Sequence, residues 1–164
     1  MRSSVGAAPR EARARRPTSQ AMRSWPAHTA LRLLAASTEA GSVRLTERFL
    51  HSDPPHGEEL AACEAHVRSL LPRLAIDHAI GVAGTVATAA KIERAGALSV
   101  HGDRLSRERV GELLDRLAAL PLAERERVHG LASARAPVIV AGLLVLNEVL
   151  GYYGVPELTV SERD

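Results

Sequence analysis

Apolar residues follow a regular spacing from residue 41 onward, and that spacing predicts the elements of this chain. Between 58 and 72 they recur every three or four positions, which places them on one face of a helix. The cluster at 52–57, with two prolines and a glycine, breaks the chain before this helix. Upstream of the break, residues 43–51 fit either a short helix or a short strand.

A strand, a glycine turn and a helix are predicted between 77 and 95. Residues 77–82 form a short stretch that is apolar in its second half and has Gly81 near its end, and glycine often bounds a strand. The turn GVAGT at 81–85 follows, then a helix from Val86 to about Ala95, which Gly96 can end. This unit favours an α/β fold over a purely helical bundle.

Two further helices are predicted in the middle of the chain. Ser106 is a good N-cap for a helix whose apolar face contains Val110, Leu113, Leu114 and Leu117. Pro121 suits the first turn of a short helix through Glu126. The charged run at 124–127 is expected to be a solvated helix face.

The last third of the chain predicts a buried helix and a final strand. Residues 137–152 are apolar on nearly every side, so this helix should be central. Gly154 and Pro156 end it, and residues 157–160 alternate in the manner of a strand.

Residues 1–36 have a different composition. Prolines recur among Ser, Ala and Arg without a helical or strand period, which predicts disorder, with a short helix around 29–36 as an option. The net charge of +2 divides into +5 for residues 1–40 and −3 for the remainder. A basic segment can contact nucleic acid, but no aromatic residues are interleaved to support this, so no nucleic-acid partner is expected.

Length and composition indicate one soluble domain. The chain has 164 residues, and its aromatic fraction of 2% requires a core of Leu, Val, Ile and Ala. The longest apolar run, 138–146, is too short to cross a bilayer, and no secretory signal is evident, so no membrane partner is expected. Cys63 is the only cysteine, which excludes an internal disulfide and favours a cytoplasmic location.

The turn at 81–85 is the strongest candidate for chemistry. Gly81 and Gly84 let backbone approach a ligand, and the N–H groups at the following helix N-terminus suit phosphate oxygens. Thr85 can cap that helix or donate to phosphate. The turn matches neither a Walker A loop nor Gly-x-Gly-x-x-Gly, so a tight turn with a purely structural role remains the alternative.

Other reactive residue types favour plain structural roles. The seven histidines lack metal-ligand spacing and are expected on the surface. Cys63 falls on the apolar face of its helix, so a buried thiol is favoured over a nucleophile. No metal-binding residue and no catalytic residue is predicted.

Four stretches, in order, resemble one protein family. They are GSVRLTERF at 41–49, GVAGTV at 81–86, RAPVIVAG at 135–142 and LTVSERD at 158–164. Together they resemble the C-terminal part of Ppx/GppA phosphatases. The resemblance implies a partial actin-like (ribonuclease H-like) lobe, α/β and helix-rich. It also implies hydrolysis of terminal phosphoanhydride bonds of polyphosphate or guanosine pentaphosphate, with Mg²⁺ as the expected cofactor, and Gly81, Gly84 and Thr85 as a wall of the cleft.

The chain also departs from that family. The first lobe with its catalytic glutamate, and a glycine-rich phosphate loop, are not found, and Pro137 stands where many members have Asp. We therefore expect a disordered or non-homologous arm at 1–40, the C-terminal part of the phosphatase domain at 41–164, and little or no activity. The alternative is a non-catalytic remnant that binds phosphate ligands or dimerises, with a homodimer as the candidate assembly.

Overall fold

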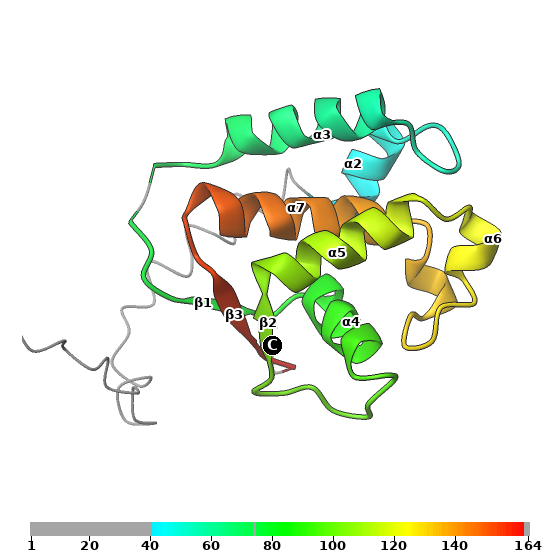
Figure 1. The fold of residues 1–164 in the computed structure, drawn as a ribbon. Coiled ribbons are helices and arrows are strands. Elements are labelled where there is room, and N and C mark those ends of the chain that lie inside the picture. The colour runs from blue at the N-terminus through cyan, green and yellow to red at the C-terminus, as the bar shows by residue number, and fades with distance from the viewer. Residues whose placement is uncertain (1–40, 74, 163–164) are drawn as a thin grey trace, which may run out of the picture. The chain divides into compact units, whose positions relative to one another are not determined.

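The computed structural model describes residues 41–73 and 75–162. The disorder predicted for 1–36, and the optional helix at 29–36, lie outside these residues. Figure 1 shows the described elements along the chain, α2 (Ser42–Phe49), α3 (Gly57–Leu70), β1 (Ala79–Gly81), α4 (Gly84–Glu93), β2 (Arg104–Ser106), α5 (Arg107–Ala118), α6 (Leu122–Arg125), the 3₁₀ turn η2 (Ser133–Arg135), α7 (Ile139–Tyr152) and β3 (Glu157–Val160). The α/β, helix-rich class is confirmed.

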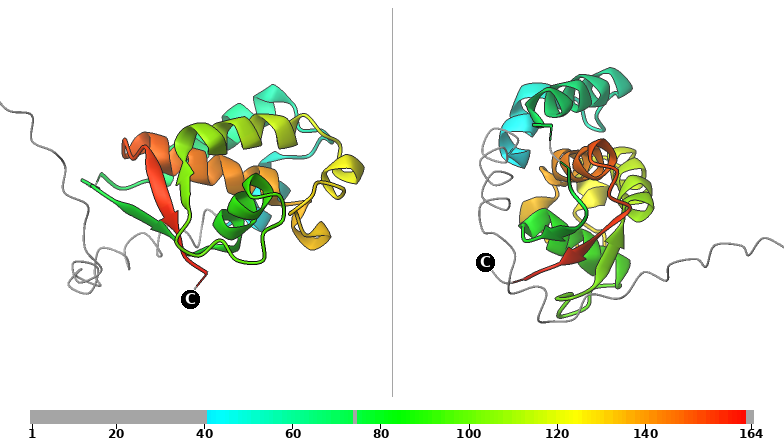
Figure 2. Two further views of the ribbon diagram at one scale, coloured as in Figure 1. Left: turned by 60° about the horizontal axis from the view of Figure 1, so that its bottom comes forward. Right: turned by 90° about the vertical axis from the view of Figure 1, so that its left-hand side faces the viewer.

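Helix α7 is the central element, as its apolar sequence predicts. Eight of its residues are buried, among them Leu143 and Leu144. It contacts α2 and α3 on one side and α4 on the opposite side, and α5 packs alongside it. Figures 1 and 2 show three layers in which α5 and α7 separate α2 and α3 from α4 and the sheet.

The sheet has three short strands in the order β1-β3-β2. Strand β3 lies in the middle, parallel to β1 and antiparallel to β2, so Leu158 is beside Ala79 on one side and Leu105 on the other. Leu158 and Val160 are buried while their neighbours are half-buried, which is the alternation predicted for 157–160. Strand β2 was not predicted.

Several predicted boundaries are confirmed or corrected. Residues 42–49 form a helix, which decides between the two alternatives for this segment. Helix α4 begins at Gly84, two residues before the predicted start, and ends at Glu93, two residues before the predicted end. Gly96, beyond the helix, takes a φ of 81°. The hydroxyl of Ser106 accepts a hydrogen bond from the backbone N–H of Arg109 at 3.2 Å, so the predicted N-cap is confirmed. Residues 133–135 form a 3₁₀ turn, and α7 itself begins later, at Ile139.

The prediction of a solvated face at 124–127 is wrong for Arg125. Its side chain is buried, with 5% of the residue exposed, and its Nη2 lies 2.6 Å from Oδ1 of Asp53. Asp53 is in the loop between α2 and α3, so this ion pair ties that loop to α6. A charged residue is buried at low cost only when a partner offsets its charge, which Asp53 does here.

A second ion pair joins α3 to the central helix. The carboxylate of Glu148, buried on α7, accepts two hydrogen bonds from the Arg68 guanidinium, through Nε and Nη2. A two-point contact of this kind fixes orientation as well as distance.

Cys63 is fully buried in the core, as predicted. Burial raises the pKa of its thiol to about 11. Within the described residues, no helix combines the length and apolar character that crossing a bilayer requires.

Candidate functional site

Gly81 ends strand β1 and allows α4 to turn back closely against it. A Cβ built at this position would lie 2.7 Å from Cγ1 of Val86, closer than real carbon atoms approach. The carbonyl of Gly81 accepts a hydrogen bond of 2.8 Å from the N–H of Ser161, just beyond β3. The glycine therefore places the N-terminus of α4 at the end of the sheet, which is where α/β folds bind ligands.

Gly84 is the first residue of α4, and the guanidinium of Arg135 lies directly against it. A Cβ at position 84 would overlap the terminal nitrogens and Cζ of that guanidinium. Arg135 is the last residue of η2, and it is exposed. The fold thus joins two of the four family-like stretches, 81–86 and 135–142, at one point.

The N-terminus of α4 and the Arg135 guanidinium are both electropositive. The first N–H groups of a helix, here those of Gly84, Thr85 and Val86, have no acceptor within the helix, and they form the positive end of its dipole. Arg135 adds a full positive charge beside them. Within residues 41–73 and 75–162, Arg135 takes part in none of the ion pairs. An anionic oxygen between the helix end and the guanidinium would satisfy both.

At the candidate site, Thr85 provides its backbone N–H and not the side-chain cap that was predicted. The N-cap of α4 is Ala83, with no side-chain hydrogen bond, so the capping role suggested for Thr85 is wrong. Its side chain packs on α7, because a Cβ at Gly142 would lie 2.8 Å from Thr85 Cγ2. The hydroxyl is directed to the same place, so what Thr85 offers at the helix end is its backbone N–H. The sequence pattern could not separate these roles.

The donor set at this site suits an anion and does not fit a metal ion. It consists of N–H groups and a guanidinium, which repel a cation and provide no oxygen ligand. Across the described part of the chain, no group of three or more His, Cys, Asp or Glu residues is arranged to hold a metal. We therefore derive no step through Mg²⁺ from these residues.

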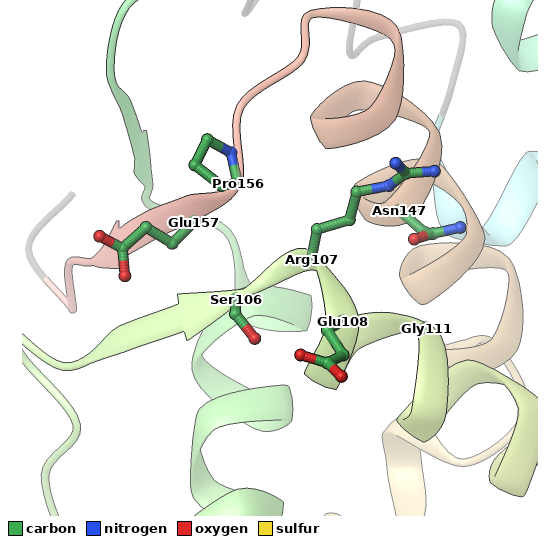
Figure 3. Close-up of a pocket in the computed structure, with 7 residues that line it drawn as sticks. All are labelled: Ser106, Arg107, Glu108, Gly111, Asn147, Pro156 and Glu157. Carbon is green, nitrogen blue, oxygen red and sulfur yellow. The ribbon is translucent and has the colours of Figure 1, made fainter.

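A separate surface depression of about 660 Å³ lies between α5, α7 and the start of β3 (Figure 3). Its lining mixes charges of both signs, from Arg107, Glu108 and Glu157. Arg107 extends toward the C-terminal end of α7, where a Cβ at Gly151 would lie 2.8 Å from its Nη2. A cation near a helix C-terminus is stabilising, so Arg107 has a structural role there. None of the predicted site residues lines this depression.

Arg135 is the residue that the sequence did not assign to the site. Its signal was present, because the RAPVIVAG stretch is one of those resembling the family. Its meaning depends on the contact with Gly84, which is 51 positions away in the chain and is visible only in the fold.

Comparison with known proteins agrees with this fold. Residues 31–163 match the model of the Ppx/GppA phosphatase family, so the chain belongs to that family. It is 32% identical over 143 residues to exopolyphosphatase 2 of Mycobacterium tuberculosis H37Rv, covering 78% of this chain and 45% of that protein. It is 28% identical over 140 residues to a bifunctional 3-dehydroquinate synthase/phosphatase of Fusobacterium nucleatum, covering 78% and 21%.

Solved structures show the same relationship. The Aquifex aeolicus Ppx/GppA enzyme superposes with a TM-score of 0.71 at 30% identity, covering 74% of this chain and 43% of that one. A type II crystal variant of the A. aeolicus phosphatase gives 0.67 at 28% identity, again with 74% and 43% coverage. The actin-like partial lobe expected from the resemblance is confirmed. The chain spans less than half the length of these relatives.

Proposed function

We propose that this chain provides a phosphate-holding wall in a phosphatase that hydrolyses terminal phosphoanhydride bonds of polyphosphate or guanosine pentaphosphate. The observation that carries the proposal is the guanidinium of Arg135 at the N-terminus of α4, beside Gly84. A guanidinium beside a helix N-terminus is an unfavourable pairing of like charges unless an anion lies between them. Phosphate oxygens supply that charge in the geometry that guanidinium and N–H donors recognise.

The residues of this wall would bind phosphate oxygens and neutralise their negative charge. In phosphoryl transfer, negative charge spreads over the oxygens of the transferred group, and donors already in place stabilise it. Arg135 and the amides of Gly84, Thr85 and Val86 would do this. A carboxylate to orient the attacking water, and the Mg²⁺ expected for the family, would have to come from groups other than these.

We therefore propose that the 164-residue chain alone binds phosphate compounds but releases little or no phosphate from them. The relative from M. tuberculosis is named an exopolyphosphatase, which supports polyphosphate as the first compound to test. Guanosine pentaphosphate rests on the resemblance alone. A cytoplasmic location and a homodimer are retained as parts of the same proposal.

Binding and turnover are tested separately. Calorimetric titration with pyrophosphate should show saturable binding to the natural chain. Arg135→Ala should weaken it about tenfold or more, because a hydrogen bond to a charged group contributes about 1.5–3 kcal/mol. Arg116→Ala, which removes an exposed arginine in the last turn of α5, is the matched control and should bind normally. Equal affinity in all three proteins would refute the proposed site.

Turnover is measured as phosphate released from polyphosphate in the presence of Mg²⁺. Binding without release is the result we expect, and the alternative role, a non-catalytic phosphate-binding or dimerisation module, predicts it as well. Size-exclusion chromatography, with and without a full-length relative, would then show whether the module associates. Release at a rate that Arg135→Ala abolishes would contradict the proposal of low activity.

A further inference from the structure

The buried side chain of Arg125 contacts the segment that carries Arg135. Its Nη2 lies 2.6 Å from Oδ1 of Asp53, and its Nη1 donates to the carbonyl of Ala136 at 3.4 Å. Ala136 is fully buried and is the next residue after Arg135. One guanidinium therefore connects the loop before α3 to the backbone beside the candidate phosphate site.

Asp53 holds this guanidinium from a fixed position. Its carboxylate also accepts the backbone N–H of Leu122, the first residue of α6, with 2.9 Å to each oxygen. Leu122 and Arg125 lie at the two ends of the same short helix. The Asp53 carboxylate thus contacts α6 at both ends, through Leu122 and Arg125. These contacts leave the Arg125 side chain little freedom to turn away from Ala136.

The backbone at Ala136 needs such support. Ala136 has helical dihedral angles, φ −53° and ψ −39°, although it precedes Pro137. Proline disfavours the helical region for the residue before it, through a clash with its Cδ. Hydrogen bonds on both sides of Ala136 oppose this preference, because its N–H donates to the carbonyl of Ser133 at 3.1 Å and its carbonyl accepts from Arg125.

Arg135 lies inside the supported turn. Its N–H donates to the carbonyl of Ala132 at 2.8 Å, and its own carbonyl accepts from the N–H of Val138 at 3.0 Å. If Ala136 relaxed toward the extended conformation that proline favours, the direction of the Arg135 side chain would change with it. The guanidinium would then leave its place against Gly84.

We infer that Arg125, locked by Asp53, is a positioning residue that holds Arg135 over the N-terminus of α4. This inference rests on the proposed function, since the positioned group, the Arg135 guanidinium, is the one proposed to bind phosphate. Arg125 does not itself bind the phosphate, because the carboxylate of Asp53 neutralises its charge. Within the described residues its Nε has no hydrogen-bond partner although it is buried. An unsatisfied buried donor costs stability, so the arginine is a poor choice for stability alone.

The test compares matched arginine-to-lysine changes. Arg125→Lys keeps the charge but loses the two-armed contact to Asp53 and Ala136. Arg68→Lys makes the same change in the pair that Arg68 forms with the buried carboxylate of Glu148. Pyrophosphate affinity is measured at a temperature where circular dichroism shows each protein folded. We expect Arg125→Lys to bind about tenfold more weakly, as the loss of one charge-assisted bond to the anion implies. Arg68→Lys should stay within about twofold of the natural chain, as expected for an independent site.

A double-mutant cycle separates positioning from a general structural effect. In an Arg135→Ala background, Arg125→Lys should cause no further loss of affinity, because the group it positions is gone. An equal loss in both backgrounds would overturn the inference. Natural affinity in folded Arg125→Lys would also overturn it if Arg135→Ala does weaken binding. Asp53→Asn, a change at a partly exposed loop residue, repeats the test if Arg125→Lys fails to fold.

The side chain of Arg135 gives a readout that needs no ligand. Its Nε–H signal in NMR spectra should shift or broaden in Arg125→Lys and remain unchanged in Arg68→Lys. An Arg135 signal that Arg125→Lys leaves unchanged would refute the positioning role. If the signal moves but no variant affects pyrophosphate binding, Arg125 positions Arg135 and the proposed phosphate function is the part that fails.

Discussion

The guanidinium of Arg135 occupies the space that a Cβ at Gly84 would require. This contact explains why glycine stands at the first position of α4, where many residue types would serve a helix equally well. It also brings two positively charged groups to one point, a helix N-terminus and an arginine. The proposed phosphate site follows from that relationship.

Gly84→Ala should separate the stability of the fold from the function of the site. Gly84 has an ordinary negative-φ backbone, and the group in the way is the end of a flexible side chain that can move aside. Urea denaturation should therefore show unchanged stability or a gain of about 0.4–1 kcal/mol. Affinity for pyrophosphate should fall, because Arg135 is displaced. Unchanged affinity in the folded variant would show that the contact has no part in binding.

Gly142→Ala should destabilise the protein through the contact between α4 and α7. The new Cβ would lie 2.5 Å from Oγ1 and 2.8 Å from Cγ2 of Thr85, where α4 packs on α7. Overpacking of this kind costs about 1–3 kcal/mol, measurable by urea denaturation. Thr85→Ala in the same chain removes both the hydroxyl and that methyl group and should restore part of the loss.

Gly111→Ala is the control for this change, because it also replaces a glycine within a helix. Only Asn147 Oδ1, at 3.8 Å, lies near a Cβ at position 111. Its stability should stay the same or rise by up to about 1 kcal/mol, since alanine favours the helix. If Gly111→Ala and Gly142→Ala behaved alike, the packing explanation would be wrong.

Cys63 should be unreactive in the native protein. Its thiol is fully buried, and burial raises its pKa from 9.0 to about 11. A rise of that size leaves about a hundredfold less thiolate at pH 8, and the thiolate is the reactive form. An aromatic disulfide reagent should label Cys63 only as the protein unfolds in urea. Rapid labelling of the folded protein would contradict this burial.

The contribution of Asp53 should depend on pH in one direction. The backbone N–H of Leu122, and then Arg125, hold the pKa of this carboxyl below its usual value. A lowered folded pKa gives stability that is present above the unfolded pKa, about 3.9, and is lost as pH falls through the folded value. The difference in unfolding free energy between the natural chain and Asp53→Asn should be constant from about pH 5 to 8 and shrink below about pH 4. A difference that persists unchanged in acid would mean that the ion pair is not its source.

Most of the helices could be predicted because the spacing of their apolar residues shows which face is buried. The leucines and valines of 58–72 and 106–118 mark one face of a helix, and residues 139–152 are apolar all round. Strand β2 could not be predicted in this way. Its three residues include one buried side chain, Leu105, which is too short a pattern to show a period.

The two key arginines could not be assigned from sequence because their partners are distant. Arg125 lies in an alternating charged run that resembles a solvated face, and Asp53, which makes its burial tolerable, is 72 positions away. Gly81, Gly84 and Thr85 were proposed from local pattern alone. The pattern indicated a helix N-terminus near a sheet, but not that the Thr85 side chain turns toward Gly142 or that the Arg135 guanidinium lies against Gly84.

The most direct test of the central claim is to locate where a phosphate compound binds. Pyrophosphate is titrated into the full chain, and backbone amide signals are followed by NMR. We predict the largest shifts at Gly84, Thr85 and Val86, together with the Arg135 side chain, and their loss in Arg135→Ala. Shifts that saturate elsewhere, with these amides unmoved, would contradict the claim that this helix end holds phosphate.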